Sequence, residues 1–150
     1  MADHFDQGIG AVYDSASMTP LESALNEIMA FPLFAGYSRA AVLELCTNGR
    51  IAITDHRQVL FQMGEPGSAF AVVLSGAYKL TKHSPIGSDV IVHFSTPGDV
   101  IAALIMSQPK SMFPVSAVSM GPSRAVVIPR ETYVKVWKNN PELIFRIQNL

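Results

Sequence analysis

The sequence has little charge, and the shortage of basic residues excludes a class of partner. Charged residues make up 15% of the 150 positions, and eleven Lys and Arg are offset by twelve Asp and Glu, for a net charge of −1. A chain without an excess of basic residues has no long-range attraction for a phosphate backbone. We therefore expect no direct nucleic-acid binding by this chain.

Cysteine is almost absent, since Cys46 is the single thiol in the sequence. One thiol cannot form an internal disulfide, and its apolar neighbours Val42, Leu43 and Leu45 indicate a buried position. This cysteine usage is typical of a reducing compartment. An iron–sulfur cluster is excluded for the same reason, because it needs about four thiolates.

Long apolar runs and a basic leader are also missing. The longest apolar runs, at 69–74 and 100–106, are too short to cross a bilayer, so we expect no membrane association. Residues 1–18 are acidic and lightly hydrophobic, unlike a signal peptide. Their lack of periodicity favours a flexible arm or a clasp that packs only in a complex. We expect a cytoplasmic protein with one domain over residues 19–150.

Catalytic and metal-binding motifs are lacking as well. The sequence contains no HExxH, paired-cysteine, P-loop or Gly-x-Ser-x-Gly pattern. His93, on a predicted strand, has the chemistry of an axial haem ligand, but a lone strand histidine is more often a core or surface residue. We predict that the protein is not an enzyme and holds no metal or other cofactor.

Helices are predicted at both ends of the chain. The start Thr19-Pro20-Leu21-Glu22 is typical of a helix N-terminus, and this helix is predicted to end near residue 30. A second helix is predicted over 38–47, with Ser38 as its N-cap and Gly49 as its left-handed stop. Further helices are predicted over 132–138 and from Asn140-Pro141 onward.

The segment between these helices predicts a β core. Short runs rich in Val, Ile, Phe and Thr alternate with turns that contain glycine. Strands are predicted at 51–54, 59–62, 69–75, 77–83, 89–95, 115–119 and 124–128. Their regular spacing favours a jelly roll or a barrel, mainly β with flanking α. Gly64, Gly76 and Gly98 are expected to shape turns, because glycine adopts positive φ without steric cost.

Four short motifs occur in an order that resembles a known family. They are the turn before Phe70, Leu74-Ser75-Gly76, Pro97-Gly98-Asp99 and the closing pattern Ile128…Tyr133…Asn140-Pro141. In this order they resemble the effector domain of CRP/FNR-type regulators, in the cyclic-nucleotide-binding-domain superfamily. The resemblance covers residues 31–150 and implies a double-stranded β-helix with N- and C-terminal helices. The family's regulators continue into a long dimer helix and a helix-turn-helix, and this sequence contains neither.

The sequence departs from this family where a nucleotide would bind. In members that bind cyclic AMP, a Gly-Glu pair holds the ribose and an Arg-Ser pair holds the cyclic phosphate, whereas the corresponding positions here are Ala102-Ala103 and Phe113-Pro114. A buried phosphate without a guanidinium or aimed N–H donors loses several kcal/mol of solvation. Lys110, the nearby cation, is a poor substitute for an arginine fork. We predict a degenerate pocket that does not bind cyclic AMP or cyclic GMP in the usual way.

Two functions remain open on this basis. In the first, the chain is the sensory half of a transcription regulator whose DNA-binding half lies outside it. Such a module would form a homodimer through an apolar stripe that begins the dimer helix, namely Leu143, Ile144, Ile147 and Leu150.

In the second, the chain is a stand-alone protein-interaction scaffold of the same fold that acts in signalling without binding DNA. Its partner would contact a Met-rich apolar patch formed by Ile105, Met106, Met112 and Phe113. An alternative interpretation is that these four side chains fill the vacated pocket.

Overall fold

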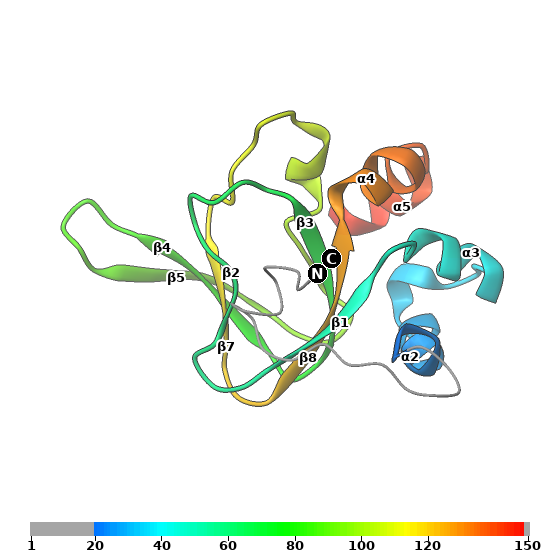
Figure 1. Ribbon diagram of the computed structural model, residues 1–150, viewed down its shortest axis with the longest axis horizontal. Helices are drawn as coiled ribbons and strands as arrows, with labels where there is room; N and C mark the ends of the chain where they lie inside the picture. The colour runs from blue at the N-terminus through cyan, green and yellow to red at the C-terminus, as the bar shows by residue number, and fades with distance from the viewer. Residues whose placement is uncertain (1–19, 149–150) are drawn as a thin grey trace, which may run out of the picture.

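The structure is a computed structural model, and it describes residues 20–148. The arm predicted over residues 1–18 and the last stripe residue, Leu150, lie outside the described residues. Within this range, the chain folds as two β-sheets with helices packed at one side (Figure 1).

The two sheets are antiparallel and contain four strands each within residues 20–148. The first has the order β1 (Arg50–Thr54), β8 (Ser123–Pro129), β3 (Ala69–Ser75) and β6 (Val100–Ile101). The second has the order β2 (Val59–Phe61), β7 (Ser116–Ser119), β4 (Tyr78–His83) and β5 (Asp89–Ser95). Two packed antiparallel sheets confirm the predicted jelly roll, and they do not close into a barrel.

Strand β3 lies inside the first sheet, and its sequence explains why. Successive side chains of a strand point to opposite faces, so a strand that is apolar at nearly every position is covered on both sides. Six of its seven residues are buried. Helical residues form one cover, because the Phe70 ring packs edge-on against Tyr133 and Trp137, with centroids 5.6 and 4.9 Å away. The core is therefore continuous from the roll into the helices.

The helices lie together at the side of the roll opposite the β4–β5 hairpin (Figure 1). They are α2 (Pro20–Met29), η1 (Pro32–Phe34), α3 (Arg39–Leu45), α4 (Arg130–Thr132), η3 (Tyr133–Trp137) and α5 (Pro141–Gln148). Two of the predicted N-caps are confirmed: the Ala41 N–H donates to Ser38 Oγ, and the Leu143 N–H donates to Asn140 Oδ1, both over 3.1 Å. Thr19, at the predicted start of the first helix, lies outside the described residues. No helix of the described range is long and apolar enough to span a bilayer.

Two local predictions need correction, and one strand was not predicted. Gly49 is not the left-handed stop of α3, because Asn48 takes that conformation with φ 60°, which asparagine tolerates. Glycine at 49 instead permits a close approach, since a Cβ there would lie 2.7 Å from the Cys46 carbonyl oxygen. The helix predicted over 132–138 begins as α4 and continues as the π-helical turn η3. The two-residue strand β6 was not predicted, because two residues are too few to show a period.

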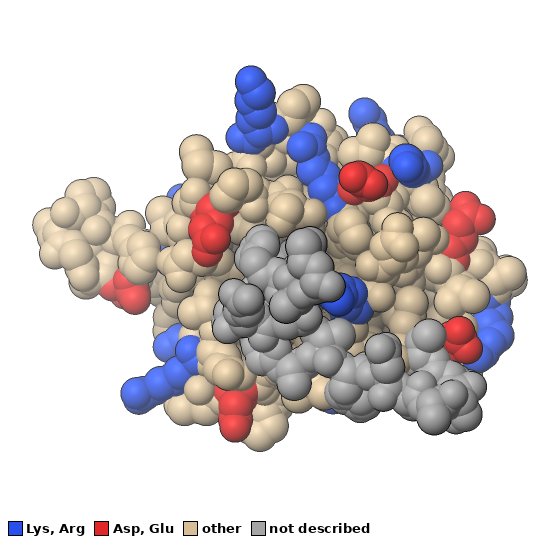
Figure 2. Space-filling view, in the orientation of Figure 1, with Lys and Arg blue, Asp and Glu red and all other residues tan. Residues whose placement is uncertain are grey.

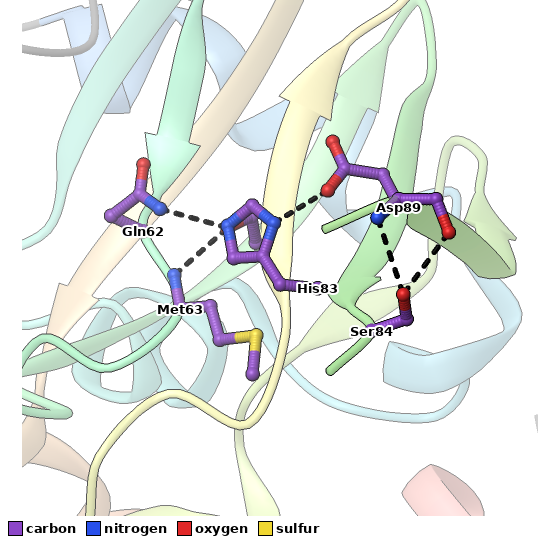
Figure 3. A network of polar contacts seen from close by, with 7 residues as sticks. Gln62, Met63, His83, Ser84 and Asp89 are labelled. Carbon is purple, nitrogen blue, oxygen red and sulfur yellow. Dashed lines mark hydrogen bonds and ion pairs between the residues drawn. The ribbon is translucent and has the colours of Figure 1, made fainter. Parts of the chain in front are cut away.

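The β4–β5 hairpin projects from the roll (Figure 1). Its strand β5 is exposed at every position except Ser95. Figure 3 shows His83 of β4 turned toward Asp89 of β5, with 2.5 Å between Nδ1 and Oδ1. His93 lies exposed on β5, as a surface residue.

Candidate functional site

The predicted pocket begins at the turn Pro97-Gly98-Asp99. The polar groups of this turn form hydrogen bonds that hold the backbone in place. Gly98 takes φ 91°, a conformation that favours glycine, and its N–H donates to the Val73 carbonyl over 2.9 Å. Asp99 Oδ2 accepts from the Thr96 N–H, also over 2.9 Å. Gly64 and Gly76 take positive φ as well, so the three glycines shape turns as predicted.

After this turn, β6 pairs with β3 and leads into Ala102 and Ala103. Ala102 takes φ 70°, in the left-handed region that disfavours alanine by about 1 kcal/mol relative to the right-handed one. The chain therefore keeps a backbone suited to glycine at the position where the family resemblance implies a glycine. Ala103 is buried, and neither side chain offers a polar atom to a ribose.

Phe113 is fixed by its ring and its backbone together. Its ring stacks on Phe61, with 4.6 Å between centroids and 15° between planes, and the residue is 5% exposed. Its N–H donates to the Glu65 carbonyl, and its own carbonyl accepts from the Gly64 N–H, each over 2.9 Å. Pro114, which is exposed, has no N–H. No hydrogen-bond donor is therefore available to a phosphate at this pair.

The four residues predicted as a partner patch do not form one surface. Met106 is fully buried and Phe113 nearly so, which corrects their assignment to a contact surface. A Cβ built on Gly67 would lie 3.3 Å from Met106 Cε and 3.1 Å from Ile105 Cδ1, so both side chains pack over that turn. Met112 is 61% exposed. Interior packing thus accounts for the buried members of the set.

The predicted dimer stripe also faces its own domain over the described part of α5. Leu143 is fully buried, which corrects its assignment to an intermolecular seam, and Ile144 and Ile147 are half-buried against the core. The Arg146 Nη1 group donates to the carbonyls of Leu33 and Ala35, over 2.9 and 2.8 Å. Intramolecular contacts therefore position this helix.

Lys110 belongs to a group of basic residues that line a cavity. Lys110 lines a cavity of about 520 Å³ on the outside of the roll, together with Arg130 and Lys135. Arg130 and Lys135 are not among the predicted site residues, because they belong to the helices after β8 and nothing in their local pattern indicates a site. The predicted nucleotide cassette of the roll, formed by Ala102, Ala103, Phe113 and Pro114, is apolar. The three basic residues that line the cavity are not part of this cassette.

The buried thiol after α3 and several buried polar groups of the roll have structural roles. Burial raises the pKa of the Cys46 thiol to about 12, which keeps it protonated and unreactive, in agreement with its predicted burial. Burial also raises the pKa of Tyr78, whose hydroxyl lies 2.8 Å from Thr54 Oγ1. Ser116 Oγ accepts hydrogen bonds from Gln62 Nε2 and the Met63 N–H; both donor residues are labelled in Figure 3.

Over residues 20–148, no three His, Cys, Asp or Glu side chains meet as a metal site requires.

Comparison with solved structures supports the fold. The chain is similar to the sensor domain of the transcriptional regulator DNR from Pseudomonas aeruginosa, at 20% identity and a TM-score of 0.71, covering 85% of each chain. It is similar to a putative cyclic nucleotide binding protein from Ruegeria pomeroyi, at 24% identity and a TM-score of 0.70, covering 87% of this chain and 57% of that one.

A third similar structure is a cAMP-binding acyltransferase from Mycobacterium smegmatis, at 20% identity and a TM-score of 0.71, covering 85% of this chain. This chain spans 39% of the acyltransferase and little more than half of the Ruegeria protein. Comparison with curated proteins gives no significant match.

A family model described as "Cyclic nucleotide-binding domain" matches residues 55–140, from the end of β1 to the start of α5. The match covers more than half of the chain and includes every strand of the two sheets except β1, the turn at Gly98 and the segment that carries Phe113. The sequence resemblance and the structural neighbours agree with it. The chain therefore belongs to the cyclic nucleotide-binding domain family.

Proposed function

We propose that the chain is a non-enzymatic sensory or regulatory module, like the effector domain of a CRP/FNR-type regulator, that does not bind cyclic AMP or cyclic GMP in the usual way. The observation that carries this proposal is the packing of Phe113. Its ring is stacked on Phe61 and its backbone groups are both hydrogen-bonded within the chain. A cyclic phosphate at this position would lose its water and gain no donor.

The physical argument is electrostatic. Transfer of an anion out of water is offset only by charge-assisted hydrogen bonds, of which an arginine fork supplies two in parallel. Ala102 and Ala103 supply no group for the ribose, and Phe113 and Pro114 supply none for the phosphate. The module would respond to a different ligand or to a protein.

The state of the single cysteine supports a non-enzymatic role. The Cys46 thiol is buried and protonated at neutral pH. The stand-alone scaffold is a weaker alternative, because two of its four predicted contact residues, Met106 and Phe113, are buried. Homodimerisation through the C-terminal helix stays a prediction, with Leu143 removed from the proposed seam.

The test is a thermal melt of the 150-residue chain with millimolar cyclic AMP or cyclic GMP, combined with backbone amide chemical shifts. A ligand at one hundred times its Kd would add about 2.7 kcal/mol to the free energy of unfolding. We expect an unchanged Tm and no shift at Ala103 or Phe113. A raised Tm with saturable shifts at these two residues would contradict the proposal.

The Phe113→Ala variant separates two reasons for exclusion. It makes room in the cassette but adds no donor, so we expect no cyclic nucleotide binding by this variant either. Saturable binding by Phe113→Ala alone would mean that the ring excludes the nucleotide by its bulk, and the electrostatic argument would then be wrong.

A further inference from the structure

The cavity that Lys110 lines lies on the outside of the roll, where three segments meet. The turn before β3 contributes Pro66, the segment between η2 (Leu104–Ser107) and β7 contributes Lys110, and the chain around α4 and η3 contributes Arg130 and Lys135. Its volume of about 520 Å³ is within the range of small-molecule sites. The cavity is separate from the residues of the predicted nucleotide cassette.

This cavity concentrates positive charge in a chain whose net charge is −1. Three basic residues, Lys110, Arg130 and Lys135, line it beside one acidic residue, Glu131. Figure 2 shows Lys and Arg side chains gathered over the segment that precedes β7 and over α4, at the top of that view. Attraction for an anion is therefore local to this part of the surface.

Arg130 is held in place at the cavity by two hydrogen bonds. Its Nε donates to the Met106 carbonyl over 2.8 Å, and its backbone N–H donates to the Ser68 carbonyl over 2.9 Å. Among residues 20–148, nothing accepts a hydrogen bond from its two terminal nitrogens. A guanidinium fixed through Nε keeps these terminal N–H groups for an incoming pair of oxygens, so little side-chain entropy is lost on binding.

The remaining walls indicate what the anion is attached to. Pro66, Pro129 and Val134 present apolar surface to the cavity. Three cations and one carboxylate leave an excess of two positive charges, which suits a dianion better than a monoanion. The second charge of a phosphate monoester is lost only below about pH 6. We propose that this cavity binds a small organic phosphate, with the dianionic phosphate on Arg130 and the two lysines and the apolar body against the prolines.

The proposed test is a titration of the 150-residue chain with phenyl phosphate at about pH 7.5, where the ester is a dianion, with phenol as the uncharged comparison. Backbone amide chemical shifts locate the binding. We expect saturable shifts at Lys110, Ser111, Arg130 and Lys135, and none with phenol. Equal shifts with phenol, or shifts centred on Phe113, would overturn the proposal.

Substitutions assign the charge contributions. We expect Lys110→Gln and Lys135→Gln each to weaken phenyl phosphate binding by about threefold to tenfold, as the loss of a charge-assisted contact predicts. Lys82→Gln, an exposed cation on the β4–β5 hairpin, is the matched control and should bind as the parent does. The proposal is wrong if Lys82→Gln weakens binding as much as the other two.

Arg130→Gln is expected to weaken binding more than tenfold, because it removes the fork. This variant also loses the hydrogen bond to the Met106 carbonyl. If that loss prevents folding, the Lys110→Gln and Lys135→Gln variants decide whether the cavity binds phenyl phosphate. The result is independent of the proposed function. Cyclic AMP is tested by shifts in the roll at Ala103 and Phe113, and phenyl phosphate by shifts in the outer cavity, so either proposal can fail without the other.

Discussion

The cassette inside the roll and the cavity outside it have opposite chemistry. The inner positions, Ala102, Ala103 and Phe113, are apolar and mostly buried, and Phe113 is packed on Phe61. The outer cavity is lined by Lys110, Arg130 and Lys135, and part of the Arg130 guanidinium has no partner within residues 20–148. The inner site has the side chains of a core, and the outer one has those of a binding surface.

This difference shows that the backbone shape of a site and its side-chain chemistry are separate properties. Gly98 and Ala102, on either side of β6, both take positive φ values, and β6 pairs with β3 between them. The side chains of Ala103 and Phe113 are apolar and buried, and this burial stabilises the roll. Specificity therefore has to be argued from side chains and not from the fold.

The largest expected effect comes from opening the inner site. Phe113→Ala should lower the free energy of unfolding by about 3 kcal/mol, because it removes a buried, stacked ring and leaves a cavity. Lys110→Ala, in the outer cavity, should change stability by less than about 0.5 kcal/mol. Denaturant unfolding measures both. Similar losses in the two variants would contradict the distinction between a packed core and a surface site.

A smaller and opposite effect is expected at Ala102. Glycine takes the observed φ of 70° without the strain of about 1 kcal/mol that alanine carries. Glycine's greater entropy in the unfolded chain offsets part of this gain, so Ala102→Gly should raise stability by about 0.5 kcal/mol. At Ala103, with φ −63° and ψ −43°, the same change should lower stability by a similar amount. A loss of stability in Ala102→Gly would show that Ala102 is not strained.

The smallest effect concerns an exposed ion pair distant from both sites. Arg124 of β8 donates to both carboxylate oxygens of Glu27 on α2, and this hydrogen bonding holds the Glu27 pKa below its usual value. A lowered folded-state pKa stabilises the protein at neutral pH, and this contribution is lost as pH falls through that pKa.

Because the pair is exposed, Glu27→Gln should reduce stability at pH 7 by less than about 0.5 kcal/mol. The difference between parent and variant should vanish in acid, as pH-dependent thermal melts would show. A loss of stability in Glu27→Gln as large as that in Phe113→Ala would contradict the view that exposed charged residues contribute little to the stability of this fold. It would also weaken the argument that the basic residues of the outer cavity serve binding and not stability.

Local patterns were enough to predict most of the strands and caps. Strand β5 was predicted with its observed bounds, and Ser38 and Asn140 cap helices as expected. The lack of polar groups at Ala102 and Phe113 was also evident. Patterns could not place Met106 or Leu143, which are apolar residues beside exposed neighbours and which turn inward in the structure.

The sequence by itself determined the period of the strands, the helix starts and the absence of a guanidinium at Phe113, because each depends on residues close together in the chain. Only the tertiary structure decided that Lys110 and Arg130 line one cavity and that Phe113 stacks on Phe61. These contacts join residues far apart in sequence, and they form because the two sheets and the helices bury a shared core that fixes where their loops meet.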